Sequence, residues 1–185
     1  MKQIRVAKPQ DIVRIRKICA ETADENLRKN EKMRRITALL FAEYYIKHEA
    51  QNCFVLEDDG NVVGYILCST DIKRFLKAYR TDILKEVASL SILWGVACLF
   101  IPLKYVLFQK KYPAHLHIDI LKEYQSSGYG SEMMRTLLNH LKKQKIKGVC
   151  LSCGKKNEKA LRFYRKCGFT PLLHAFGGVM MGVKF

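Results

Sequence analysis

The spacing of hydrophobic residues changes several times along the chain, and each change predicts an element. Short runs rich in β-branched and aromatic residues predict strands, whereas apolar residues three and four positions apart predict helices. The strands expected on this basis span residues 3–7, 53–56, 62–67, 115–120, 146–153, 170–176 and 179–185. One helix is expected to begin at Pro9, others span about 32–48, 131–141 and 158–167, and residues 72–113 are expected to be helical and basic.

Two of these predictions rest on especially regular patterns. Residues 58–61, with the sequence DDGN, separate two β-rich runs and predict an antiparallel hairpin. Met134, Leu137 and Leu141 share one face of the helix expected at 131–141.

Composition indicates an ordinary folded protein. The chain has 185 residues, of which 49% are hydrophobic, and this content excludes a disordered chain. A length of this order corresponds to one domain, so we expect residues 1–185 to fold as a single unit. The seven cysteines are odd in number and follow no disulfide pattern, which predicts free thiols in a reducing compartment. Cys150 and Cys153 form a CxxC without a second pair, and we interpret them as buried thiols rather than a zinc or redox site.

One apolar segment raises the question of a membrane. Residues 87–103 contain no charged side chain, but a helix of 17 residues covers only about 26 Å of a hydrocarbon core of about 30 Å. Pro102 would also disturb its last turn. We therefore favour a buried or interface helix, with docking of Val87–Phe108 on a membrane surface as the alternative. The N-terminus has no apolar signal region, so a cytoplasmic location is expected.

Charge is distributed unevenly. The net charge is +16, yet residues 1–71 carry 12 basic and 11 acidic groups whereas residues 72–185 carry 21 basic and 6 acidic groups. An asymmetry of this size points to an anionic partner, such as a polyphosphorylated cofactor, nucleic acid or an acidic membrane. Before any motif is considered, a solvated lysine-rich surface explains it equally well.

The first motif that supports an anionic partner is a glycine-containing loop at residues 125–130, with the sequence QSSGYG. The loop follows the strand expected at 115–120 and precedes the helix expected at 131–141. Backbone N–H groups of such a loop converge at a helix N-terminus, where partial positive charge and the absence of a glycine side chain favour a phosphate. A plain strand-to-helix turn is the alternative interpretation of the loop alone.

The second motif lies at residues 157–169, with the sequence NEKALRFYRKCGF. Asn157 is a candidate N-cap for the helix that follows, and Gly168 a candidate stop. Tyr164 falls seven residues after Asn157, so both lie on one helical face. Taken alone, a buried tyrosine on such a face is more often explained by packing than by catalysis.

Together, the order of strand, QxxGxG, helix, strand and NxxAxxFYxxxGF resembles the GNAT superfamily of acyl-CoA-dependent N-acyltransferases. The elements before these motifs match as well, so the resemblance covers nearly the whole chain except residues 72–113. It implies an α/β (α+β) GNAT fold, with a mixed central sheet of about six to seven strands flanked by helices. Residues 72–113 would be a helical insertion between the third and fourth strands.

The resemblance also implies an enzyme that transfers an acetyl group from acetyl-CoA to a primary amine by direct attack in a ternary complex, without a metal. The loop N–H groups would hold the CoA pyrophosphate, one strand and an asparagine would flank the pantetheine arm, and a tyrosine would protonate the departing thiolate. The residues that match these cofactor-binding positions are Ile118, Ile120, Gln125, Ser126, Ser127, Gly128, Tyr129, Gly130, Ser131 and Asn157. Tyr164 matches the general acid. Lys122 departs from the pattern because many members have proline there.

The general base is a separate question. His115, His117 and Asp119 alternate along their strand and so line one face of it. Such a polar row is unusual on a strand that helices cover on both sides. It is explained by a proton relay for the incoming amine, by a hydrogen-bonded structural trio or by a metal site. For the relay we favour Asp119 acting with His117.

The insertion and the acceptor are the least determined by sequence. The insertion and the YPAHLHIDI strand after it are similar to bacterial GNAT proteins resembling the acetyltransferase-like domain of some O-GlcNAcases. Segments beside the cleft shape the acceptor site in this superfamily, so the insertion is a candidate for acceptor selection or homodimer contact. The expected acceptor is a small-molecule or protein amine, and a catalytically silent acyl-CoA-binding or protein-interaction module is the alternative function. Nucleic acid is not expected, because no recognition motif accompanies the basic residues.

Overall fold

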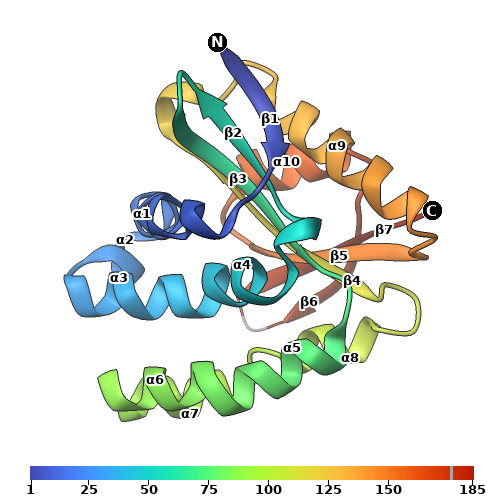
Figure 1. The fold of residues 1–185 in the computed structure, drawn as a ribbon. Coiled ribbons are helices and arrows are strands. Elements are labelled where there is room, and N and C mark those ends of the chain that lie inside the picture. Colours follow the sequence, from blue (N-terminus) through green and yellow to red (C-terminus); the bar gives the residue numbers. More distant parts are fainter. Residues whose placement is uncertain (176) are drawn as a thin grey trace.

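The computed structural model describes residues 1–175 and 177–185 and has a seven-stranded mixed sheet at its centre (Figure 1). The strand order is β1-β2-β3-β4-β5-β7-β6, and β4 and β5 are parallel neighbours whereas every other pair is antiparallel. The strands are β1 (Lys2–Val6), β2 (Phe54–Asp58), β3 (Asn61–Ser69), β4 (Ala114–Ile120), β5 (Gly148–Gly154), β6 (Thr170–Ala175) and β7 (Gly178–Lys184).

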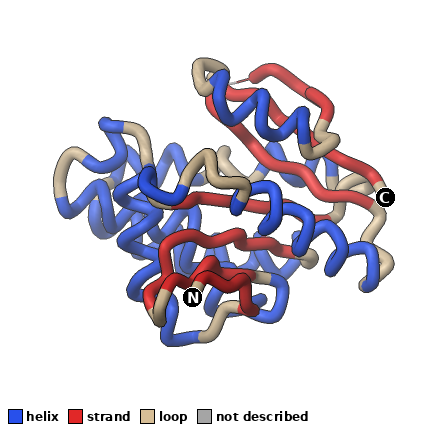
Figure 2. The backbone as a smooth tube through the Cα atoms, turned by 90° about the horizontal axis from the view of Figure 1, so that it is seen from above, coloured by secondary structure: helices blue, strands red, loops and turns tan. Residues whose placement is uncertain are grey.

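Helices cover both faces of this sheet (Figure 2). On one face lie α9 (Tyr129–Lys143) and α10 (Glu158–Lys166), which bury Met133, Leu137 and Leu161 against the strands. The other face is covered by α1 (Ile12–Thr22) and by a long helical segment made of α3 (Glu31–Ala38), a π-helical stretch (Leu39–Glu43) and α4 (Tyr44–Glu49). The remaining short elements are α2 (Glu25–Arg28) and 3-10 turns at Pro9–Asp11, Ala50–Asn52 and Lys122–Tyr124.

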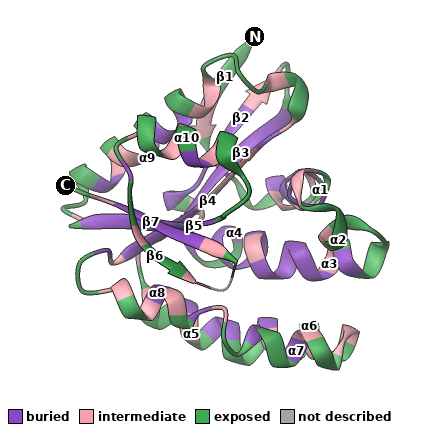
Figure 3. Ribbon diagram, turned by 180° about the vertical axis from the view of Figure 1, so that it is seen from behind, coloured by how far each residue is buried: buried purple, intermediate pink, exposed green. Residues whose placement is uncertain are grey.

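The expected insertion is present between β3 and β4. It consists of α5 (Ile72–Ala78), a π-helical stretch (Tyr79–Ile83), α6 (Leu84–Leu90), α7 (Ile92–Cys98) and α8 (Leu103–Phe108). Its inner side joins the core that lies under α1, α3 and α4, while its outer side leaves apolar residues exposed (Figure 3). These exposed residues are Ile92, Leu93, Val96, Leu99, Phe100, Leu103 and Leu107. Within the described part of the chain, no helix combines the length and the apolar character that crossing a membrane requires.

The structure differs from the sequence prediction in three respects. The helix expected at 32–48 contains a π-helical stretch, and α2 was not expected at all. The two closing strands were expected as a pair, but β7 also inserts between β5 and β6. Residue 176, the last residue of the strand expected at 170–176, lies outside the described residues. All seven cysteines are free thiols, and Cys150 and Cys153 lie buried in β5.

The pairing of β4 with β5 determines where a site can form. Only two residue pairs join these strands, Ala114 with Val149 and His115 with Cys150. The other edge of β4 is fully paired with β3, from Ser69–His115 to Gly64–Ile120. Beyond His115, therefore, the β5-facing edge of β4 diverges from its neighbour and opens the centre of the sheet.

Candidate active site

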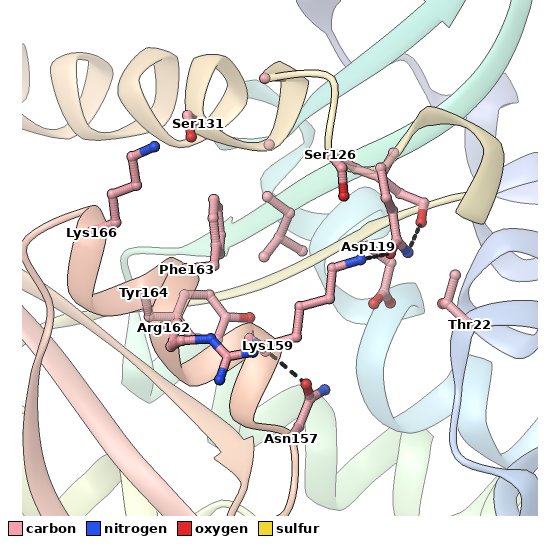
Figure 4. A pocket seen from close by; sticks show the side chains of 16 residues that line it. Thr22, Asp119, Ser126, Ser131, Asn157, Lys159, Arg162, Phe163, Tyr164 and Lys166 are labelled. Carbon is pink, nitrogen blue, oxygen red and sulfur yellow. Dashed lines mark hydrogen bonds between the residues drawn. The ribbon is translucent and has the colours of Figure 1, made fainter.

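A cavity of about 520 Å³ occupies the opening between the diverging strands (Figure 4). The end of β4, the loop at 125–128, the first turn of α9 and one face of α10 form its walls, and Thr22 of α1 closes one side. Its lining residues are Thr22, Ile118, Asp119, Ile120, Gln125, Ser126, Gly128, Gly130, Ser131, Asn157, Lys159, Ala160, Arg162, Phe163, Tyr164 and Lys166. Most of the residues expected to bind the cofactor are therefore brought together, whereas Ser127 and Tyr129 line neither this cavity nor the one described below.

The loop is held in an unusual backbone conformation. Ser126 has φ 64° and Gly128 has φ 87°, both in the left-handed region, which a glycine tolerates far better than a serine. The Gln125 side chain fixes the loop on both sides: its Nε2 donates to the carbonyl of Ile120 at 2.9 Å, and its Oε1 accepts from Lys159 Nζ at 2.9 Å. The loop is thus tied to β4 and to α10.

The backbone N–H groups of residues 126–131 have no hydrogen-bond acceptor within the described chain. They lie at the N-terminus of α9, whose first intrahelical bond runs from the Glu132 N–H to the Gly128 carbonyl. Free N–H groups at a helix N-terminus form a site for an anion. Gly130 keeps the approach open, because a Cβ there would already lie 3.4 Å from the ring of Phe163.

Three cations of α10 add positive charge to the same cavity. Lys159, Arg162 and Lys166 all line it, and Figure 4 shows them along one side of α10. Sequence reasoning did not single them out. Their spacing of three and four residues on an amphipathic helix was the available signal.

A second cavity, of about 290 Å³, meets the first at its inner end. The two share the lining residues Ile118, Asp119, Asn157, Ala160 and Tyr164. Beyond these, the second cavity is lined by residues of the π-helical stretch, α4, the insertion and β5, and by His117. A ligand in each cavity would meet at Asp119 and Tyr164.

Asp119 is the centre of a small polar cluster at this junction. The Tyr65 hydroxyl of β3 donates to Asp119 Oδ2 at 2.5 Å, and His117 Nε2 lies 3.1 Å from the same oxygen. Burial raises the pKa of the Asp119 carboxyl and lowers the pKa of the His117 imidazole, because each loses solvation of its charged form. His117 is therefore a neutral imidazole near pH 7, able to exchange a proton with the carboxylate. Tyr65 was missed because it lies 54 residues from Asp119 in the chain.

His115 stands apart from this pair. Its ring lies in an aromatic cluster, 4.5 Å from Phe75 and 4.3 Å from Tyr105 between ring centroids. Burial lowers the pKa of His115 to about 3, and its Nε2 has no partner in the described chain. The structure thus separates the three residues of the polar row into a pair at the cavity junction and one buried structural histidine.

Cys19 of α1 approaches the same pair. Its Sγ, a His117 nitrogen and an Asp119 oxygen all lie within 4.8 Å of one another. A metal would require the thiolate, yet burial raises the pKa of Cys19 to about 12. The protonated thiol that this favours is a poor metal ligand.

Tyr164 and Asn157 lie on one face of α10, as predicted, and both line both cavities. The Asn157 side chain caps the helix, since its Oδ1 accepts from the Ala160 N–H at 3.0 Å. Its amide nitrogen remains available as a donor. Burial raises the pKa of Tyr164 above its ordinary value, so its hydroxyl stays protonated well above neutral pH and can act as a proton donor.

Comparison with known proteins agrees with this geometry. Residues 15–169 match the family described as Acetyltransferase (GNAT) family. The chain belongs to the GNAT acetyltransferase family. Among solved structures, that titled Crystal structure of SsHAT is 30% identical with a TM-score of 0.87, covering 99% of this chain and 98% of that one. The PaiA N-acetyltransferase from Thermoplasma acidophilum in complex with coenzyme A is 14% identical, with coverage of 100% and 99% and a TM-score of 0.65.

A third GNAT structure shares the fold at lower identity. The polyamine N-acetyltransferase of Drosophila melanogaster, which forms N-acetylagmatine, is 11% identical, covers 100% of each chain and has a TM-score of 0.67. The prediction of a GNAT fold and of an acetyltransferase is thereby confirmed. The roles of individual residues are a separate question.

Proposed function

We propose that this GNAT protein transfers the acetyl group of acetyl-CoA to a primary amine by direct attack in a ternary complex. One observation carries the proposal: two cavities, one under a loop of free N–H groups and cations, meet at Asp119 and Tyr164. The CoA-bound structure of the PaiA relative supports the choice of cofactor.

The larger cavity would hold acetyl-CoA. The N–H groups of residues 126–131 bind the pyrophosphate, and Lys159, Arg162 and Lys166 supply the positive charge that CoA phosphates require. The edge of β4 at Ile118 and Ile120 lacks a strand partner on its β5 side, so the amides of the pantetheine arm can pair with it. The Asn157 amide flanks the arm from α10.

The reaction would take place at the junction of the cavities. The neutral amine nitrogen attacks the thioester carbonyl carbon, forming a C–N bond. Asp119, assisted by His117, accepts the proton that the amine loses, and Tyr65 fixes the carboxylate by its hydrogen bond. As the C–S bond breaks, the electron pair leaves on the CoA sulfur, which Tyr164 protonates. No metal enters this scheme.

The test is release of free thiol from acetyl-CoA across a panel of amines, aminosugars, polyamines, amino acids and basic peptides. We expect thiol release to depend on the presence of an amine. Double-reciprocal plots of initial velocity should give intersecting lines, as a ternary complex requires. Binding of acetyl-CoA without turnover on any amine would instead indicate a catalytically silent module. Covalent acetylation of the enzyme by acetyl-CoA in the absence of an amine, followed by transfer of that acetyl group to an added amine, would contradict direct attack.

A further inference from the structure

The insertion between β3 and β4 supplies one wall of the smaller cavity. Four of its lining residues, Phe75, Ile101, Lys104 and Tyr105, belong to the insertion between β3 and β4. Phe41 of the π-helical stretch and Tyr45 of α4 line the same cavity. The insertion therefore contributes directly to the side of the site that would hold the acceptor amine.

Lys104 is the cation among these residues. Its side chain lines the cavity, and Lys104 Nζ lies 5.1 Å from the centre of the Tyr105 ring. In the described chain it forms no ion pair with a carboxylate. Burial lowers the pKa of its ammonium to about 8, which leaves the group mostly charged at pH 7. A buried cation without a carboxylate partner is costly unless a ligand supplies the counter-charge.

Aromatic and aliphatic side chains form much of the other walls, and His117, Ser152 and Asn157 add polar groups. The aromatic lining residues are Phe41, Tyr45, Phe75 and Tyr105, and the His115 ring packs against the last three. Asp119, at the junction with the larger cavity, is the one acidic side chain among the described lining residues. An acceptor in this cavity thus meets a proton acceptor in Asp119, a cation in Lys104 and aromatic side chains beside them.

This arrangement discriminates among amines. A polyamine or a lysine side chain in a basic peptide would bring a second positive charge toward Lys104. A carboxylate would instead form a charge-assisted hydrogen bond with it. The volume, about 290 Å³, is at the lower end for ligand cavities and suits a small molecule.

We propose that the acceptor of this enzyme is a small amino acid-like molecule with an apolar body, whose amine lies at Asp119 and Tyr164 and whose carboxylate is bound by Lys104. Lys104 is then a specificity-determining residue that the insertion supplies. This inference rests on the proposed acetyl transfer and adds to it the chemical class of the acceptor.

Matched substrates test the inference. Phenylalanine is compared with phenethylamine, and 6-aminohexanoate with pentylamine, so that each pair differs by the carboxylate alone. We expect kcat/KM to be higher for the acid of at least one pair, and Lys104→Met to reduce that preference by about 10- to 100-fold. Lys104→Arg should retain part of it, because the cation remains. Lys110→Met, an exposed lysine of the same insertion, is the control and should leave the preference unchanged.

A second readout does not depend on turnover. Calorimetry with N-acetylphenylalanine in the presence of CoA should show binding to the wild type and about 10-fold or more weaker binding to Lys104→Met, while CoA binding stays the same and confirms a folded variant. N-acetylphenethylamine should bind both proteins equally. Spermidine, if acetylated at all, should improve in Lys104→Met, because the repulsion is removed.

The inference is wrong if the carboxylate adds nothing to binding or to kcat/KM in the wild type, or if Lys104→Met leaves the difference intact. It is also wrong if spermidine is the best acceptor of the wild type. Thiol release from decarboxylated amines alone would overturn this inference while leaving acetyl transfer standing. Absence of thiol release with every amine would instead overturn the proposed function, and the N-acetylphenylalanine titration would still decide the role of Lys104.

Discussion

Tyr164 lies where the two cavities meet, and burial raises the pKa of its hydroxyl above the ordinary value. In the proposed mechanism this hydroxyl protonates the CoA thiolate as it leaves. Replacement by phenylalanine removes only this oxygen. We predict that Tyr164→Phe lowers kcat by about 100- to 10,000-fold while acetyl-CoA affinity changes little.

Steady-state thiol release and calorimetry of the same preparation measure the two quantities. Tyr112→Phe is the matched control, since Tyr112 is buried away from both cavities. Equal turnover of Tyr164→Phe and the wild type would remove Tyr164 from the role of acid.

His115 gives a prediction about stability at the same scale. Its pKa is about 3 in the folded chain and about 6.5 when unfolded, so the unfolded state binds the extra proton first. Its contribution to stability is therefore complete above pH 6.5 and is lost as the pH falls toward 3. Urea unfolding should show that His115→Leu reduces the stability loss between pH 7 and pH 5 by about 2 kcal/mol. An unchanged pH dependence in the variant would contradict a buried neutral histidine.

Residue by residue, the sequence predicted the site unevenly, for a physical reason. Asp119 and the loop at residues 125–130 stand out by local patterns, and Tyr164 was assigned by the resemblance of its local motif to the family. Tyr65 and Lys104 belong to distant segments, and only the pairing of β3 with β4 and the folding back of the insertion bring them near the other residues. A single sequence carries no local signal for such contacts.

At the scale of elements, α10 presents one charged face to the cavity and another to solvent. Arg162 and Lys166 line the cavity, whereas Arg165 does not. If α10 contributes charge to CoA binding, the double variant Arg162→Ala/Lys166→Ala should weaken acetyl-CoA binding by about 3- to 20-fold at low salt, and by less at high salt. Arg165→Ala on the same helix should have little effect. Equal effects of the two changes would indicate general electrostatic attraction rather than a directed contact.

The elements themselves were largely predictable where the pattern was strong. α9 and α10 follow a clear helical period, and the DDGN turn at residues 58–61 has positive φ at Asp59 and Gly60, as a tight hairpin requires. The π-helical stretches at 39–43 and 79–83 follow no such rule, because one extra residue in a turn leaves the apolar pattern almost unchanged. The place of β7 between β5 and β6 depends on long-range pairing, and adjacency in sequence suggested only a hairpin.

At the scale of the whole molecule, the sheet consists of two halves joined by only two residue pairs between β4 and β5. A ligand that contacts β4 on one side and α10 on the other bridges the halves. Acetyl-CoA at 100 times its Kd should add about 2.7 kcal/mol to stability, which for a domain of this size raises Tm by roughly 5–10 °C. Thermal unfolding measures this directly. A Tm that does not respond to saturating acetyl-CoA would argue against a ligand that bridges the two halves.

The central claim is that the cavity between the diverging strands is an acetyl-CoA site. Calorimetric titration of the wild type with acetyl-CoA tests it most directly, with Gly130→Val as the variant because a larger side chain there would occupy space beside Phe163. The account predicts one saturable site, competition by free CoA and much weaker binding to Gly130→Val. Absence of binding to the wild type, or equal binding to a folded Gly130→Val, would contradict it.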